Sequence, residues 1–149
     1  MVKRYCGESA KTVTAKNKGT LLMSKSMKIL IVDDDTALLA TSKLMFSSLG
    51  HKPITASDAD QALDILKEDK EIDFIFTDLG LPKIDGWELI HRARVEGFDK
   101  PIAVVSGVSD YVNKELMEDL KVFRNISKPF KLSDLSDLLQ SVEEIIGED

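Results

Sequence analysis

The chain has few of the residues that extracellular, metal-binding and membrane proteins depend on. Cys6 is the only cysteine, so no disulfide can form within the chain and no thiolate metal site can be built. His51 and His91 have no metal-ligand spacing, and we expect both to be exposed and without function. No apolar run approaches the roughly 18 residues that a membrane span needs. These scarcities favour a reducing compartment, and we expect a cytoplasmic protein with no membrane contact.

The first 26 residues differ in charge from the rest of the chain. They carry six basic side chains against one acidic one, a net charge of +5, and since the whole chain carries −6, residues 27–149 carry −11. So acidic a domain argues against nucleic-acid binding. Residues 1–26 lack the apolar core of a secretory signal. We expect these residues to form a basic, disordered extension. Alternatively, translation starts at Met23 or Met27 instead of Met1, and the residues before that start are not part of the protein. In both cases one domain follows.

From Met27 onward, strand-like and helix-like segments alternate. The expected strands cover 28–32, 52–56, 72–77, 102–105 and 122–127, and the expected helices cover 36–49, about 59–66, 87–96, 110–120 and a last segment that includes 135–146. In the first helix Leu38, Met45 and Leu49 share a stripe and Gly50 is the stop. The run 57–60 resembles a capping box. Five successive βα units predict a parallel sheet with helices on both faces.

Four of these strands run into polar side chains at their carboxyl ends. The residues concerned are Asp33, Asp34, Asp78, Ser106 and Lys128. Because the carboxyl ends of parallel strands share one edge of the sheet, and ligands bind at that edge, we expect these side chains to surround one pocket. Three carboxylates, a hydroxyl and an ammonium together indicate a site for a divalent cation and a phosphoryl group.

The three aspartates predict a hard cation. Two carboxylates about 5 Å apart repel by roughly 3 kcal/mol at an effective dielectric of ~20, so the cluster needs a counter-ion or shifted pKa values. Ligands that are all oxygen favour Mg²⁺, or Mn²⁺, and the backbone carbonyl of Gly80 offers a further oxygen. Asp78 is then the candidate nucleophile, while Ser106 and Lys128 are placed to hold a phosphoryl oxygen. Lys128 precedes a proline, the common setting for a cis peptide bond.

These motifs occur along the chain in the order typical of one family: residues 27 to about 147 resemble a stand-alone response-regulator receiver domain. The matching features are the pair Asp33/Asp34, Asp78, the loop 82–86, Ser106 and the run 128–130. The resemblance implies a flavodoxin-like (βα)5 three-layer sandwich of the chemotaxis-regulator type, with sheet order 2-1-3-4-5.

The resemblance also implies a function in two-component signal transduction. Asp78 would accept a phosphoryl group from a histidine kinase or a histidine phosphotransfer protein, with Mg²⁺ required. Beyond catalysing its own phosphorylation and dephosphorylation, such a module is not an enzyme. Its phosphorylation would change the affinity for a downstream protein, bound through the face formed by the fourth helix, fifth strand and fifth helix.

One residue departs from the family pattern. The position three residues before Lys128 is usually aromatic in the family, and that aromatic side chain moves inward on activation. Here the position is Asn125, so the aromatic part of the family's switch is missing. Tyr111 is a candidate substitute. Gly80 and Val108 occupy positions where family side chains tune hydrolysis, and glycine has no side chain to orient water.

Two other functions stay open. A phosphatase similar to the haloacid dehalogenase superfamily also uses a strand-end aspartate with Mg²⁺, but its Asp-x-Asp-x-Thr/Val motif is met here only at Asp33 and Asp35, since Ala37 follows. A pseudo-receiver that binds partners without phosphorylation is the other alternative. The intact set of three acidic residues argues against it.

Overall fold

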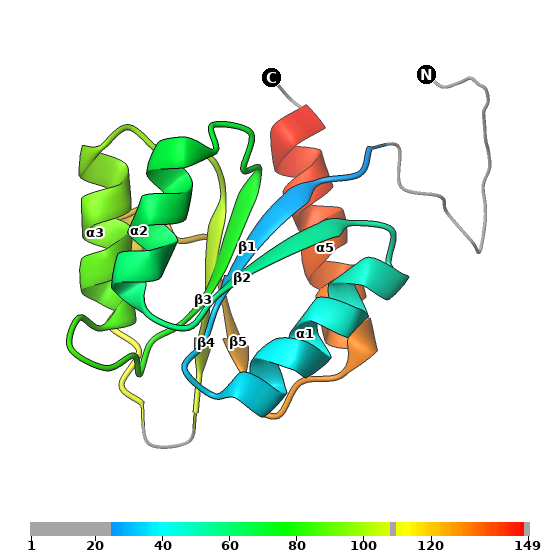
Figure 1. Cartoon of the computed structure of the whole chain (residues 1–149), viewed down its shortest axis with the longest axis horizontal. Coiled ribbons are helices and arrows are strands. Elements are labelled where there is room, and N and C mark those ends of the chain that lie inside the picture. Colours follow the sequence, from blue (N-terminus) through cyan, green and yellow to red (C-terminus); the bar gives the residue numbers. More distant parts are fainter. Residues whose placement is uncertain (1–24, 108–109, 148–149) are drawn as a thin grey trace.

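The computed structural model describes residues 25–107 and 110–147, and its centre is a five-stranded sheet (Figure 1). The strands are β1 (Lys28–Val32), β2 (Lys52–Ala56), β3 (Phe74–Asp78), β4 (Ile102–Ser106) and β5 (Arg124–Ser127). All neighbouring strands are parallel, and their order is β2-β1-β3-β4-β5. The predicted sheet order is therefore confirmed. The basic extension predicted for residues 1–26 lies almost wholly outside the described residues.

Helices cover both faces of this sheet. They are α1 (Thr36–Ser48), α2 (Ala59–Glu68), α3 (Gly86–Val95), α4 (Lys114–Asp119) and α5 (Leu132–Gly147). Figure 1 shows α1 and α5 on one side of the strands and α2 and α3 on the other. Met117 and Leu120 place α4 on the second side, because they pack against the core cluster that α2 and α3 share. Among the described helices, none is long and apolar enough to cross a membrane.

β3 is the central buried strand, and all five of its residues are buried. Phe74 and Phe76 face the core under α1 and α5, while Ile75 faces the core under α2 and α3. The Phe76 ring makes edge contacts with Phe46 at 5.2 Å and Phe130 at 5.7 Å between ring centroids. Burial on both faces is the reason for the nearly continuous apolar run. It also holds the residue that ends the strand, Asp78, in a defined place.

The helix starts are set by short polar side chains. Asp35, Asp58, Asp85 and Asn113 are the N-caps of α1 to α4, and each accepts a hydrogen bond from a free backbone N–H of the first turn. The capping box predicted to begin at Ser57 is therefore shifted by one residue, with Asp58 as the cap. α4 begins later than the predicted residue 110, because the cap is at Asn113.

The buried face of α1 also differs from the prediction. Leu39, Ser42 and Phe46 are buried, whereas the predicted stripe of Leu38, Met45 and Leu49 is only half-buried. The true stripe includes a serine, which an apolar pattern overlooks. The predicted stop is confirmed in outline: α1 ends at Ser48, and Gly50 has φ +92°, a conformation that glycine adopts without strain.

Arg94, near the end of α3, binds four backbone carbonyls at the edge of the sheet opposite to the carboxyl ends of the strands. Its guanidinium donates to the carbonyl oxygens of Phe98 (2.9 Å), Lys100 (2.7 Å), Leu120 (2.9 Å) and Lys121 (3.1 Å). The last two residues directly follow α4. One side chain therefore fastens the end of α4 to the end of α3.

His51 is buried, at 5% exposure, so the expectation that it is exposed is wrong, while His91 is exposed as expected. The backbone N–H of Met27 donates to His51 Nδ1 at 3.0 Å, and this contact between the starts of β1 and β2 leaves Nδ1 as an acceptor. Burial lowers the pKa of His51, because the imidazolium would lose its hydration.

We therefore expect His51 to make folding sensitive to mild acid. The unfolded chain takes up this proton near pH 6.5 and the folded chain only at lower pH, so the stabilisation is complete above about pH 6.5 and is lost as the pH falls below it. Urea unfolding between pH 7.5 and 5.5 should show that His51→Asn, which keeps an acceptor near Nδ1, loses less stability over this range than wild type. His91→Asn is the control for loss of a histidine. Equal losses in wild type and His51→Asn would contradict the assignment.

Candidate functional site

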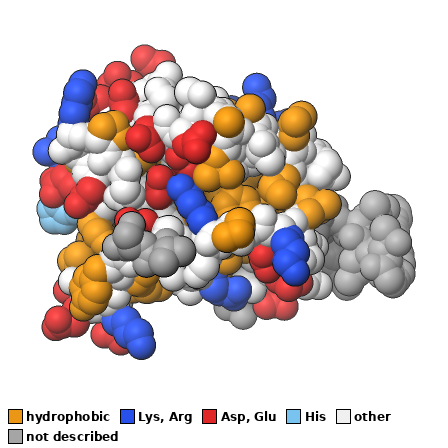
Figure 2. Space-filling model, turned by 90° about the horizontal axis from the view of Figure 1, so that it is seen from below, with side chains coloured by type: hydrophobic (Ala, Val, Ile, Leu, Met, Phe, Trp, Pro, Cys, Tyr) orange, Lys and Arg blue, Asp and Glu red, His pale blue; other side chains and the backbone are white. Residues whose placement is uncertain are grey.

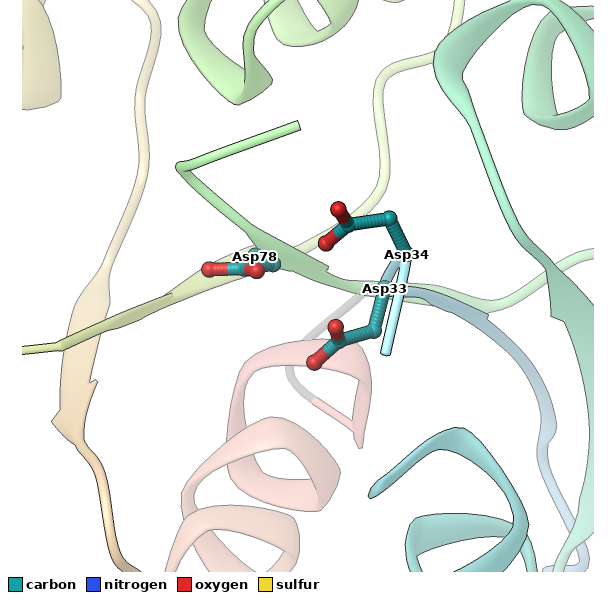
Figure 3. A group of neighbouring side chains, drawn as sticks. All are labelled: Asp33, Asp34 and Asp78. Carbon is teal, nitrogen blue, oxygen red and sulfur yellow. The ribbon is translucent and has the colours of Figure 1, made fainter. Parts of the chain in front are cut away.

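The three predicted acidic residues meet at the carboxyl edge of the sheet. Asp33 and Asp34 follow β1, and Asp78 ends the neighbouring β3, where Val32 lies opposite Thr77. A carboxylate oxygen from each aspartate lies within 4.8 Å of one from each of the others. Figure 3 shows the three side chains converging from the two strand ends. Asp33 and Asp78 are buried and Asp34 is exposed, so the cluster opens to solvent on one side.

Asp33 occupies the inner part of this cluster. Its Oδ1 accepts a hydrogen bond from the backbone N–H of Asp35 at 2.9 Å. Burial raises the pKa of Asp33, and the neighbouring charge of Asp78 raises it further, while the Asp35 N–H and Lys128 act in the opposite direction. The upward shift therefore comes first from burial and only secondly from the nearby negative charge of Asp78.

Lys128 supplies positive charge to the cluster. Its ammonium lies 3.1 Å from Asp78 Oδ2 and 3.4 Å from Asp33 Oδ2. Burial, the largest single influence, lowers the pKa of Lys128, but the hydrogen bond to Asp78 and the attraction of both carboxylates outweigh it, so the pKa is raised. The Lys128–Pro129 bond is cis, as expected, and the Lys128 N–H donates to Ser106 O at 2.9 Å. The side chain therefore stays protonated and bridges the two buried acids.

Ser106 ends β4 beside the acceptor strand, since Val105 lies opposite Asp78. Its side chain is buried, and its hydroxyl donates to Asn125 Oδ1 at 2.9 Å. Sequence reasoning placed Ser106 at this edge but missed the bond, because a contact between β4 and β5 leaves no local pattern. Tyr111, the candidate substitute for the missing aromatic residue, is 80% exposed and does not fill an interior position. Val108 lies outside the described residues.

The loop after β3 is shaped by two glycines. The Gly80 N–H donates to Asp78 Oδ1 at 3.3 Å. Gly86 is packed so closely that an added Cβ would overlap the carbonyl oxygen of Asp78 and lie 2.8 Å from Leu79 Cα. Asp110, which sequence reasoning did not single out, accepts from Gly107 N–H at 2.7 Å and has Oδ1 3.7 Å from where a Cβ on Gly80 would lie. The loops after β3 and β4 thus border one another.

The donor set fits a hard divalent cation. Asp33, Asp34 and Asp78 offer only oxygen ligands, the type that Mg²⁺ prefers. Three carboxylates against the one ammonium of Lys128 leave a net charge of −2, which a divalent ion would balance. Figure 2 views this edge of the molecule and shows acidic and basic side chains next to one another near its middle. The arrangement can bind a cation together with a phosphoryl group whose oxygens the cation and Lys128 would neutralise.

Comparisons with known proteins agree with this geometry. Residues 29–140 match the model of the response regulator receiver domain. The chain is 30% identical over 115 residues to a probable transcriptional regulator ycf27 of Porphyridium aerugineum, covering 77% of this chain and 47% of the relative. It is 32% identical over 119 residues to the two-component response regulator ORR21 of Oryza sativa subsp. indica, covering 78% of this chain and 17% of the relative. The chain thus spans less than half the length of these relatives.

Solved structures show the same architecture. A CheY-like response regulator receiver domain protein from Methanospirillum hungatei superposes with a TM-score of 0.76 at 25% identity, covering 84% of this chain and all of that one. A receiver domain protein from Clostridium thermocellum gives a TM-score of 0.75 at 25% identity, covering 81% of this chain and 97% of that one. This chain belongs to the response regulator receiver domain family, whose members are the signal-receiving modules of two-component systems.

We expect Gly86 to tolerate no side chain, because a Cβ would collide with the backbone that carries Asp78. Gly86→Ala should lower the free energy of unfolding by about 1–3 kcal/mol, the usual cost of overpacking a close contact. Gly147→Ala is the matched control, since a Cβ at the end of α5 meets nothing within 4 Å. Urea unfolding of both variants checks this, and a Gly86→Ala protein as stable as wild type would contradict the close approach.

Proposed function

We propose that Asp78 is the phosphoryl acceptor of this receiver domain and that Lys128 and the acidic pair around it form the accepting site. The observation that carries the proposal is the bridge from the Lys128 ammonium to both Asp78 and Asp33. In the transfer, the N–P bond of a phosphohistidine breaks, an O–P bond to Asp78 forms, and the freed imidazole takes up a proton. Phosphoryl transfer needs little covalent chemistry from the protein, so the main tasks of the site are to position the reacting groups and to neutralise their charge.

Each side chain has a distinct part in this proposal. Lys128 holds a phosphoryl oxygen through its ammonium, and Ser106 can supply a hydroxyl hydrogen bond from the next strand. Asp33, Asp34, Asp78 and the Gly80 carbonyl would hold Mg²⁺. Bound Mg²⁺ neutralises charge on the phosphoryl oxygens during transfer. The domain catalyses only its own phosphorylation and dephosphorylation, so it acts as a regulator and not as an enzyme on other substrates.

The phosphatase alternative is weakened by the position of Asp35. That mechanism would use Asp33 as nucleophile and Asp35 as a second catalytic acid, but Asp35 is the exposed N-cap of α1, and its Oδ1 accepts from the backbone N–H of Ala37 and Leu38. The Asp35 carboxylate therefore caps α1 and is not placed to act as a catalytic acid. A pseudo-receiver without phosphorylation would have no need for the buried like charges of Asp33 and Asp78, which are costly to keep together.

The phosphodonor in this proposal is a histidine kinase or a histidine phosphotransfer protein, in the cytoplasm where ATP is available to charge it. The downstream partner would be a protein that binds α4, β5 and α5. Two elements of this face are accessible to a partner, since α4 has no buried residue and β5 is a half-exposed edge strand. The net charge of −11 over residues 27–149 makes direct binding to nucleic acid by this domain unfavourable.

Mg²⁺ should stabilise the fold through the acidic cluster. A ligand that binds only the folded state at ten times its Kd adds about 1.4 kcal/mol of stability, so thermal unfolding should shift upward with Mg²⁺. Asp34→Asn removes an exposed charge from the cluster, and we expect it to abolish most of that shift. Asp60→Asn, an exposed acid on α2, is the matched control and should keep it. A full Mg²⁺ shift in Asp34→Asn would rule out this ligand.

Acetyl phosphate with Mg²⁺ tests the acceptor directly. Intact-protein mass spectrometry should show one added phosphoryl group that hydroxylamine removes, as expected of an acyl phosphate. Asp78→Asn keeps the shape of the side chain but cannot attack phosphorus, so the label should be lost completely. Peptide mapping identifies the labelled residue. Label on Asp33 instead of Asp78 would favour the phosphatase reading, and no label on either would contradict the proposal.

A further inference from the structure

Asn125 is the residue that the Ser106 hydroxyl contacts, and it stands at the position where the family has an aromatic side chain. Ser106 Oγ donates to Asn125 Oδ1 at 2.9 Å. Arg124 and Ile126, on either side, face α5, since Arg124 bonds Ser141 and Ile126 packs in the core under α1 and α5. Because side chains alternate along a strand, Asn125 faces the other side of the sheet, toward α4.

A serine hydroxyl has only one proton to donate. In this structure that proton is used in the bond to Asn125. A phosphoryl group on Asp78 would bring oxygens to the same edge of the sheet. When ionised, these oxygens can only accept hydrogen bonds. Ser106 can therefore donate to Asn125 or to the phosphoryl group, but not to both at once.

We infer that Asn125 is a positioning residue that holds the Ser106 hydroxyl away from the phosphoryl site and is released when Asp78 is phosphorylated. This inference rests on the proposed function, because it needs a phosphoryl group on Asp78. In the unphosphorylated domain the Ser106–Asn125 bond favours the resting arrangement of the β4 end. After phosphorylation Ser106 turns to the new acceptor, and the Asn125 amide loses its partner on the α4 side of β5.

The released amide offers a route for the signal that does not need an aromatic side chain. The half-buried Asn125 side chain then needs another donor, either from a neighbouring residue or from a bound partner, since a shielded polar group without a partner is unfavourable. The Ser106–Asn125 hydrogen bond therefore lowers the affinity of the site for a phosphoryl group. It also couples phosphorylation of Asp78 to the surface around β5.

Titration with beryllofluoride and Mg²⁺, an acyl-phosphate mimic, tests the inference by isothermal titration calorimetry. Asn125→Leu has a similar shape without the acceptor, and it should bind beryllofluoride about 2- to 10-fold more tightly, the equivalent of one net hydrogen bond. Asn125→Ala serves as a second variant should the leucine impair folding. Ser127→Ala, an exposed change in the same strand, is the matched control and should leave the Kd unchanged.

A double-mutant cycle with Ser106→Ala separates this role from a general structural effect. Ser106→Ala alone should weaken binding, and adding Asn125→Leu to it should then change the Kd by less than about 1.5-fold, because the competing bond is already gone. An Asn125→Leu protein that binds as wild type does, or more weakly, would overturn the inference. Weaker binding would mean that Asn125 supports the active orientation of Ser106. A wild-type protein that binds no beryllofluoride would overturn the proposed function instead.

Discussion

The crowding of negative charge between β1 and β3 is the constraint to which the rest of this domain is adapted. Asp33 and Asp78 are both buried, and a single ammonium from Lys128 reaches both of them. Like charges at this distance are unfavourable unless a cation lies near. The region of the described chain where three carboxylates meet is therefore also the one to which we assign the binding of a cation and of a phosphoryl group.

The surrounding packing keeps these charges in place. β3 is covered on both faces, and the contacts of Phe76 with Phe46 and Phe130 connect it to α1 and to the segment after Lys128. Gly86 lets the start of α3 lie directly against the Asp78 backbone. These contacts hold the backbone of Asp78 in a defined place beside the end of β1.

The sequence predicts the sheet and the location of the site because both depend on local patterns. Apolar runs that end in Asp33, Asp78 or Ser106 indicate strands, and parallel strands bring their carboxyl ends to one edge. Contacts across strands have no such signature. The bonds of His51 to the Met27 N–H and of Ser106 to Asn125 depend on which residues lie side by side after folding. The stripe of α1 was missed for a related reason, since burial there includes a serine.

Arg94 has a mechanical consequence for α4. The carbonyls it binds after α4, those of Leu120 and Lys121, anchor the carboxyl end of that helix, while none of the six residues of α4 itself is buried. The other end of the helix follows the loop that begins at Ser106. A force applied to the amino end of α4 would therefore meet less resistance than one applied to the carboxyl end, where Arg94 binds the backbone.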